Sequence, residues 1–163
     1  MEVNGLPLHP LIVHAVVIFV PLGALSAIGF ALVPRWRWLL RWPTLLLAIA
    51  AVVFTRLAVV SGGQLMTSRK LGGDLIARHQ TWGHRLEYAV WVYAVVAILA
   101  FWVLPVTARL VGAVDRPSPA PSLVTVVTVL LAITAAVVLV FAVITGDAGA
   151  RALWQIPTVP KAQ

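Results

Sequence analysis

The sequence predicts an all-α integral membrane protein, a four-helix bundle that could be assembled from two helical hairpins. No Asp, Glu, Lys or Arg occurs in residues 3–34, 88–108 or 117–146. Each of these gaps is long enough for a helix that crosses the hydrocarbon core of a bilayer, which takes about 20 residues. Hydrophobic residues make up 61% of the chain, charged residues make up 10%, and the mean hydropathy is +1.00. These values lie well outside those of soluble domains.

The size and charge of the chain limit the class of protein further. We expect the 163 residues to form a single membrane domain, 1–163, because four spans with short connections leave no length for a separate soluble domain. The net charge of +7 comes mainly from basic residues beside the apolar segments, which favours anionic lipid headgroups over nucleic acid as the counterpart. Cysteine is absent, so disulfides, thiolate metal sites and cysteine nucleophiles are excluded.

The first predicted hairpin contains spans at 10–33 and 39–60. Pro10 suits the first position of a helix, where its missing N–H has no helical partner. The turn at 34–38 is rich in the Trp and Arg that anchor at the headgroup level. Ser61-Gly62-Gly63 is predicted to end the second helix. The first apolar segment has no basic residues before it and no small-residue cleavage site, so we interpret it as a retained span.

The second predicted hairpin follows a polar loop at 64–85 and contains spans at 86–111 and 122–145. A proline-rich turn at 115–119 joins these two spans. Gly146 and Gly149 are predicted to end the last helix, and the tail at 151–163 is predicted to be interfacial.

The four spans place most of the chemically capable side chains on one side of the membrane. An even number of spans brings the start of the first and third helices and the end of the second and fourth to the same side. We call this side the polar face, and it contains His9, His14, Arg56, Ser61, His79, His84, Arg85, Glu87, Thr145, Asp147 and Arg151.

The two hairpins also share a short pattern. Histidines five residues apart open each hairpin, as His9 and His14 and as His79 and His84. The segment 59–63 closes the first hairpin and resembles 143–147 at the end of the second. Two helices per unit would make a parallel repeat, related by an axis along the membrane normal.

The histidines are the candidate ligands. An ionisable group inside a span is costly unless it faces the bundle interior and finds a partner. We expect His14 and His84 to converge on a cofactor such as haem b, with Arg56 holding a propionate. Alternatively, imidazoles and a carboxylate could bind copper or zinc, with the ligands drawn from His9, His14, His79, His84 and Asp147.

Two other interpretations stay open. The polar groups could satisfy one another as a hydrogen-bonded network that fixes helix register, or they could contact a quinone headgroup or a proton path. In either case the guanidinium of Arg56 needs a carboxylate, and we expect Asp147 in preference to Glu87. Alternatively, the Arg56 side chain extends to the lipid headgroups and has no carboxylate partner.

Two motifs resemble a known family. The opening Leu8-His9-Pro10-Leu11-Ile12-Val13-His14 and the closing Thr145-Gly146-Asp147-Ala148-Gly149 resemble those of domain-of-unknown-function family 2231, a group of predicted four-helix bacterial membrane proteins. The resemblance covers about residues 6–154 and implies the same architecture with a shared histidine-bearing face. Many members have His where this chain has Asp147, and the family implies no established activity.

These observations together favour a small multi-pass protein of the bacterial inner (plasma) membrane that binds a cofactor and takes part in membrane redox chemistry. The alternative is a non-catalytic accessory subunit of a larger membrane complex, such as a respiratory assembly. The expected partners are the lipid bilayer and such a complex or a second copy of the chain. No motif indicates an enzyme.

We expect both termini to lie outside the cytoplasm. The first span usually dominates orientation, and here it is followed by three Arg (Arg35, Arg37 and Arg41) and preceded by no basic residue. A tag at the C-terminus should therefore be accessible to protease added outside intact cells. A tag that becomes accessible only after lysis would contradict this orientation.

Overall fold

The computed structural model describes residues 2–3, 6–106 and 119–154, and four long helices make up most of them. All four are long and apolar enough to cross a membrane, so the predicted all-α multi-pass bundle is confirmed. The helices are α1 (Leu8–Leu32), α2 (Arg37–Arg69), α3 (Asp74–Val103) and α4 (Pro121–Trp154). A 3-10 turn, η1 (Pro34–Trp36), joins α1 to α2, and β1 (Glu2–Val3) pairs antiparallel with β2 (Leu6–Pro7).

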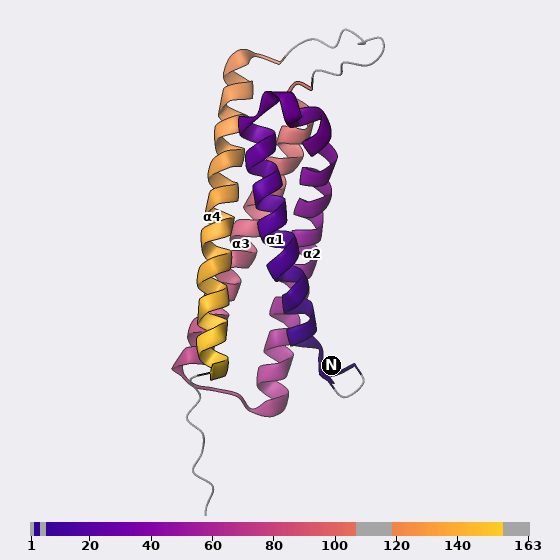
Figure 1. Ribbon diagram of the computed structural model, residues 1–163. Coiled ribbons are helices and arrows are strands. Elements are labelled where there is room, and N and C mark those ends of the chain that lie inside the picture. Colours follow the sequence, from indigo (N-terminus) through magenta and orange to yellow (C-terminus); the bar gives the residue numbers. More distant parts are fainter. Residues whose placement is uncertain (1, 4–5, 107–118, 155–163) are drawn as a thin grey trace, which may run out of the picture.

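The helices follow one another around the bundle. Consecutive helices pack against each other, and α1 also packs against α4, which leaves α1 diagonal to α3 and α2 diagonal to α4. Figure 1 shows the start of α1, the connection from α2 to α3 and the end of α4 at the same end of the bundle. The residues of the polar face therefore gather at that end, as the helix count predicts.

Small side chains fill the centre of the bundle. Seven of the alanines that line it, Ala24, Ala27, Ala48, Ala51, Ala97, Ala100 and Ala135, are almost completely buried. Small residues let helix backbones approach closely, which favours association where no hydrophobic force acts between helices. Tyr93 on α3 links the two diagonal helices α3 and α1, because its buried hydroxyl donates a hydrogen bond to the Gly23 carbonyl of α1 over 2.9 Å.

Two arginines close the end opposite the polar face. The buried Arg37 donates from Nε to the Phe30 carbonyl and from Nη2 to the Ala31 carbonyl, both over 3.2 Å. Arg41 donates to the carbonyl of Phe101, near the end of α3, over 3.2 Å and stacks on the Phe101 ring. The last carbonyls of a helix have no partner within it, so these arginines cap helices as well as anchoring the bundle.

The predicted polar loop at 64–85 is wrong. The helix α2 continues through Gly62 and Gly63 to Arg69, and α3 begins at Asp74, so only four residues separate them. The turn instead uses Lys70, with a φ of 49°, and Gly73, with a φ of 115°. Glycine disfavours a helix by only about 1 kcal/mol, and tertiary packing at Gly62 overrides that preference.

The ends of α3 and α4 also differ from the predicted spans. The helix α4 continues through Gly146 and Gly149 to Trp154, so the first four residues of the predicted tail are helical. The helix α3 ends at Val103. Residues 107–111 of the predicted span, 115–118 of the predicted proline-rich turn and 155–163 of the predicted tail lie outside the described residues. At about 1.5 Å per residue, α2 is about 50 Å long and exceeds the roughly 30 Å hydrocarbon core.

The hydrogen bond between Tyr93 and Gly23 should stabilise the bundle. Replacing Tyr93 with Phe removes the donor and should lower the free energy of unfolding by about 0.5–1.5 kcal/mol, measured as reversible unfolding in detergent. The matched control is Tyr88→Phe, because Tyr88 lies on the same helix and is 69% exposed. Equal stability of the two variants would contradict a role for the diagonal bond.

Candidate functional site

The two histidines that meet at the polar face are His9 and His79. Their ring centres lie 6.4 Å apart, with the ring planes at 71°. His9 is on the first turn of α1 and His79 is on the second turn of α3, and both are half-buried. Because α1 and α3 are diagonal in the bundle, the pair lies between the two hairpins.

A backbone carbonyl holds each of these imidazoles. The Nδ1 atom of His9 is 3.0 Å from the Ala58 carbonyl oxygen on α2, and the Nδ1 atom of His79 is 3.1 Å from the Thr145 carbonyl oxygen on α4. Ser61 adds a second contact to His9 Nδ1 at 3.3 Å. A carbonyl oxygen can only accept, so Nδ1 carries a hydrogen in both rings, and in the neutral form of each ring Nε2 carries the lone pair.

A glycine makes room for each ring. A Cβ atom added at Gly62 would lie 3.0 Å from Cε1 of His9, and one added at Gly149 would lie 2.8 Å from Cε1 of His79. In both hairpins this glycine follows the carbonyl-bearing residue by four positions, one helical turn. The sequence suggested helix ends at these glycines, but they are the positions where an imidazole packs on the helix.

The same contact in both hairpins defines the internal repeat. His9 and His14 precede His79 and His84 by 70 residues, whereas Ala58 and Gly62 precede Thr145 and Gly149 by 87 residues. The predicted match of 59–63 with 143–147 is therefore out of register by three residues. Gly23 and Tyr93, which are also 70 residues apart and therefore occupy equivalent positions in the two halves, are in contact near the centre of the bundle.

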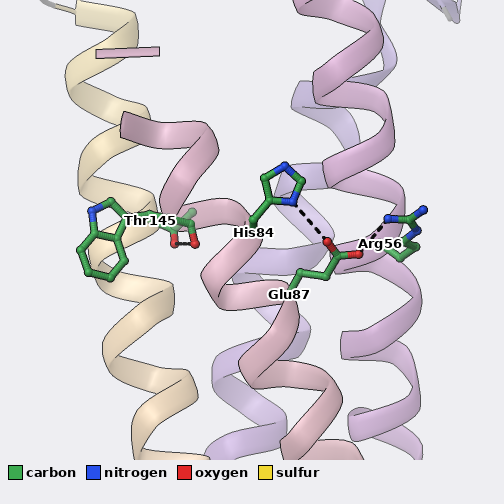
Figure 2. Close-up of polar contacts among 5 residues, drawn as sticks. Arg56, His84, Glu87 and Thr145 are labelled. Atoms are coloured by element: carbon green, nitrogen blue, oxygen red, sulfur yellow. Dashed lines mark hydrogen bonds and ion pairs between the residues drawn. The ribbon is translucent and has the colours of Figure 1, made fainter. Parts of the chain in front are cut away.

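A second polar cluster joins α2 to α3. Arg56 Nη1 is 3.1 Å from Glu87 Oε1, and His84 Nδ1 is 3.5 Å from Glu87 Oε2. Figure 2 shows the Glu87 carboxylate between the imidazole and the guanidinium. The Glu87 side chain is 9% exposed, whereas those of Arg56 and His84 are 59% and 46% exposed. The buried charge is therefore the carboxylate, and its two partners extend toward the surface.

A groove runs beside this cluster. It is a shallow depression that is largely open to the outside, and six of its seven lining residues belong to α2. Its lining residues are Val59, Val60, Gly63, Gln64, Thr67, Ser68 and His84.

The structure does not bring His14 to the predicted centre. His14 is exposed, and its Nδ1 lies 2.6 Å from the carbonyl oxygen of Pro10, one turn earlier on the same helix. Five positions along a helix correspond to a rotation of about 140°, so His9 and His14 face different directions. His9 takes the inner position, and the expected convergence of His14 with His84 is wrong.

The predicted pair of Arg56 with Asp147 is also wrong. Asp147 accepts a 2.8 Å hydrogen bond from Arg151 on its own helix, and both side chains are 55% exposed. Arg56 is on α2, which packs against α3 and lies diagonal to α4. Glu87 on α3 is therefore the carboxylate within reach.

The predicted five-residue metal set is not assembled. Within the described part of the chain, no three His, Cys, Asp or Glu side chains are grouped so that they could hold one metal ion. The histidines separate into the His9–His79 pair, the exposed His14, and His84 in the second cluster. The sequence did not predict the His9–His79 pair. Its one signal for this contact is a glycine inside each partner helix, and a glycine at these positions also suggests the end of a helix.

No protein family, curated protein or solved structure matches this chain. The resemblance to family 2231 stays a prediction. The roles of the two clusters are therefore inferred from their geometry.

We expect Arg56 and Glu87 to be energetically coupled. In a double-mutant cycle with Arg56→Met and Glu87→Gln, the coupling energy should lie within the range of about 0.5–3 kcal/mol that is typical of contacting residues. The measurement is unfolding of the purified protein in detergent. The same cycle with Arg56→Met and Asp147→Asn should give no coupling, and a larger value there than for Glu87 would contradict the pairing.

Proposed function

We propose that this protein binds a redox-active metal ion at the polar face through the imidazoles of His9 and His79. The observation that carries the proposal is the paired geometry of these two rings, one from each hairpin, with both Nδ1 atoms held by backbone carbonyls. Histidines that ligate metals almost always donate the other ring N–H to a carbonyl or carboxylate, which fixes the tautomer and the ring orientation.

The distance between the rings fits one shared ion. A metal–imidazole bond is about 2 Å long and the nitrogen lies on the order of 1 Å from the ring centre, so two rings that bind one ion from opposite sides have centres about 6 Å apart. The observed separation is 6.4 Å. The described hydrogen bonds of both rings use Nδ1, which leaves Nε2 as the ligating atom.

Copper is the ion that this pair suits best. Imidazole is a good ligand for copper, and two nitrogen ligands can satisfy copper(I). A structural zinc site takes four protein ligands, more than the described residues group together. Haem iron also accepts two imidazoles, but the porphyrin would have to enter where α1 and α3 approach across a core of small residues.

A metal at this position would connect the protein to redox chemistry at one surface of the bilayer. The half-buried pair lies on helices that cross the membrane, close to where soluble donors and acceptors could reach it. The alternative of an accessory subunit in a larger membrane complex stays a prediction.

The purified protein should contain copper in equimolar amount after expression in copper-supplemented cells. Elemental analysis provides the measurement of copper, and an absorption spectrum tests for haem. His9→Ala and His79→Ala should each abolish the bound copper, because one imidazole leaves the ion with half its protein ligands, whereas His14→Ala should retain it. Circular dichroism serves as the control for folding.

Two outcomes would change the assignment. A Soret band that disappears in His79→Ala but persists in His14→Ala would assign the same two ligands to haem iron. A folded parent protein with neither copper nor haem would overturn the proposal.

A further inference from the structure

The end of the bundle opposite the polar face carries an excess of positive charge. Figure 1 shows this end, where α1 and α3 end and α2 and α4 begin. Arg35, Arg37 and Arg41 lie here, in η1 and the first turns of α2, and we call them the arginine cluster. The acidic residues in the described part of the chain all lie toward the other end, and they are Glu2, Asp74, Glu87 and Asp147.

The helix dipoles do not offset this charge. A helix carries about +0.5 elementary charge at its N-terminus and about −0.5 at its C-terminus. Because two helices end here and two begin here, the four terminal charges cancel. By sequence, residues 104–120 add Arg109 and Arg116 against the single acid Asp115, so the charge of this end stays positive.

The guanidinium of Arg37 is buried and has a donor left over. Arg37 is 7% exposed, and its Nε and Nη2 atoms donate to carbonyls of α1. Its Nη1 atom makes no hydrogen bond to a described residue. Among the described residues, the Thr55 hydroxyl is the one fully enclosed side-chain N or O without a partner, so Nη1 of Arg37 is reachable from outside. A buried charge is costly unless a counter-charge pairs with it.

Arg41 presents a second guanidinium on the same face of α2. Residues four apart on a helix are neighbours, so Arg41 lies one turn after Arg37. Its Nε atom donates to the Phe101 carbonyl, and its guanidinium stacks on the Phe101 ring at 4.0 Å. Trp42 packs against the same ring at 5.0 Å. These contacts hold the Arg41 guanidinium in place, and its two Nη atoms make no hydrogen bond to a described residue.

The surrounding tryptophans place the arginine cluster at the depth of the lipid headgroups. Trp36, Trp38 and Trp42 are all exposed, and tryptophan is enriched at the interface between hydrocarbon and water. The anion that is abundant at this depth is the phosphate of a lipid. Guanidinium groups match phosphate oxygens through paired N–H donors.

We propose that the arginine cluster binds the headgroup of one anionic phospholipid, with Arg37 and Arg41 donating hydrogen bonds to its phosphate and Arg35 adding charge. The net positive charge of this end favours an anionic over a zwitterionic headgroup, because the cationic group of a zwitterionic lipid is repelled. The orientation expected from the sequence places this end in the cytoplasmic leaflet, where anionic lipids produce a negative surface potential. The site does not depend on a metal at the His9–His79 pair.

The test is native mass spectrometry of the full chain in detergent, titrated with phosphatidylglycerol or with phosphatidylcholine of the same acyl chains. The parent should bind one phosphatidylglycerol about tenfold or more tightly than phosphatidylcholine. Arg41→Gln should weaken binding of phosphatidylglycerol about tenfold, or about 1.4 kcal/mol. Arg41→Lys should weaken it less, because it keeps the charge but loses the planar fork. Arg85→Gln is the matched control and should leave binding unchanged, since Arg85 also stacks on an aromatic ring, that of Trp82, but near the polar face.

A second variant separates lipid binding from folding. Arg35 is exposed and makes no hydrogen bond to a described residue, so Arg35→Gln leaves the helix caps intact. This variant should weaken binding of phosphatidylglycerol about twofold to fivefold, as expected for an exposed charge, and it decides the outcome if Arg41→Gln does not fold. Equal affinities of the parent for the two lipids, or equal binding by the parent and the folded variants of the arginine cluster, would overturn the proposal. Displacement of the lipid by millimolar inorganic phosphate would also overturn it, because the site would then take a free anion.

Discussion

The structure depends on one constraint: polar groups inside an apolar bundle must find partners within the protein. Lipid offers no hydrogen bonds, so an unsatisfied donor or acceptor at that depth costs several kcal/mol. The inward-facing polar side chains discussed above accordingly contact another helix, whereas the buried hydroxyl of Thr55 has no hydrogen-bond partner among the described residues. His9 and His79 bind carbonyls of α2 and α4, and Tyr93 binds a carbonyl of α1. The same contacts that satisfy these groups fix the register of the helices.

This constraint gives the glycines their role. A helix carbonyl is already engaged with the N–H four residues later, and the imidazoles of His9 and His79 reach such carbonyls where the surface of the helix is bare. Gly62 and Gly149 provide that bare surface one turn after the carbonyl. The bundle can therefore bring two imidazoles close to its central axis without widening, and the repeat of this contact in both hairpins makes the His9–His79 pair nearly symmetric.

The second cluster has the opposite character, because it occurs in one half of the bundle. Arg56 and Glu87 have valines at the equivalent positions of the other half. A buried carboxylate needs a counter-charge, and a buried ion pair is weak evidence for stability because desolvation opposes the attraction. The pair lies beside the groove, and His84 contacts both. The two similar hairpins therefore form a bundle in which this ionic cluster occurs on one side only.

The sequence alone determined the membrane-spanning class, the four helices and the side on which the polar residues gather, since these follow from the length of uncharged runs and from helix parity. It could not determine which histidine faces inward or which carboxylate Arg56 reaches. Those outcomes depend on how each helix is rotated about its axis and on the order of the helices around the bundle. Because apolar residues cover all sides of each helix, the sequence pattern does not indicate which side faces inward. The positions of Gly62 and Gly149 were visible, but only packing distinguishes a glycine that ends a helix from one that receives a ring.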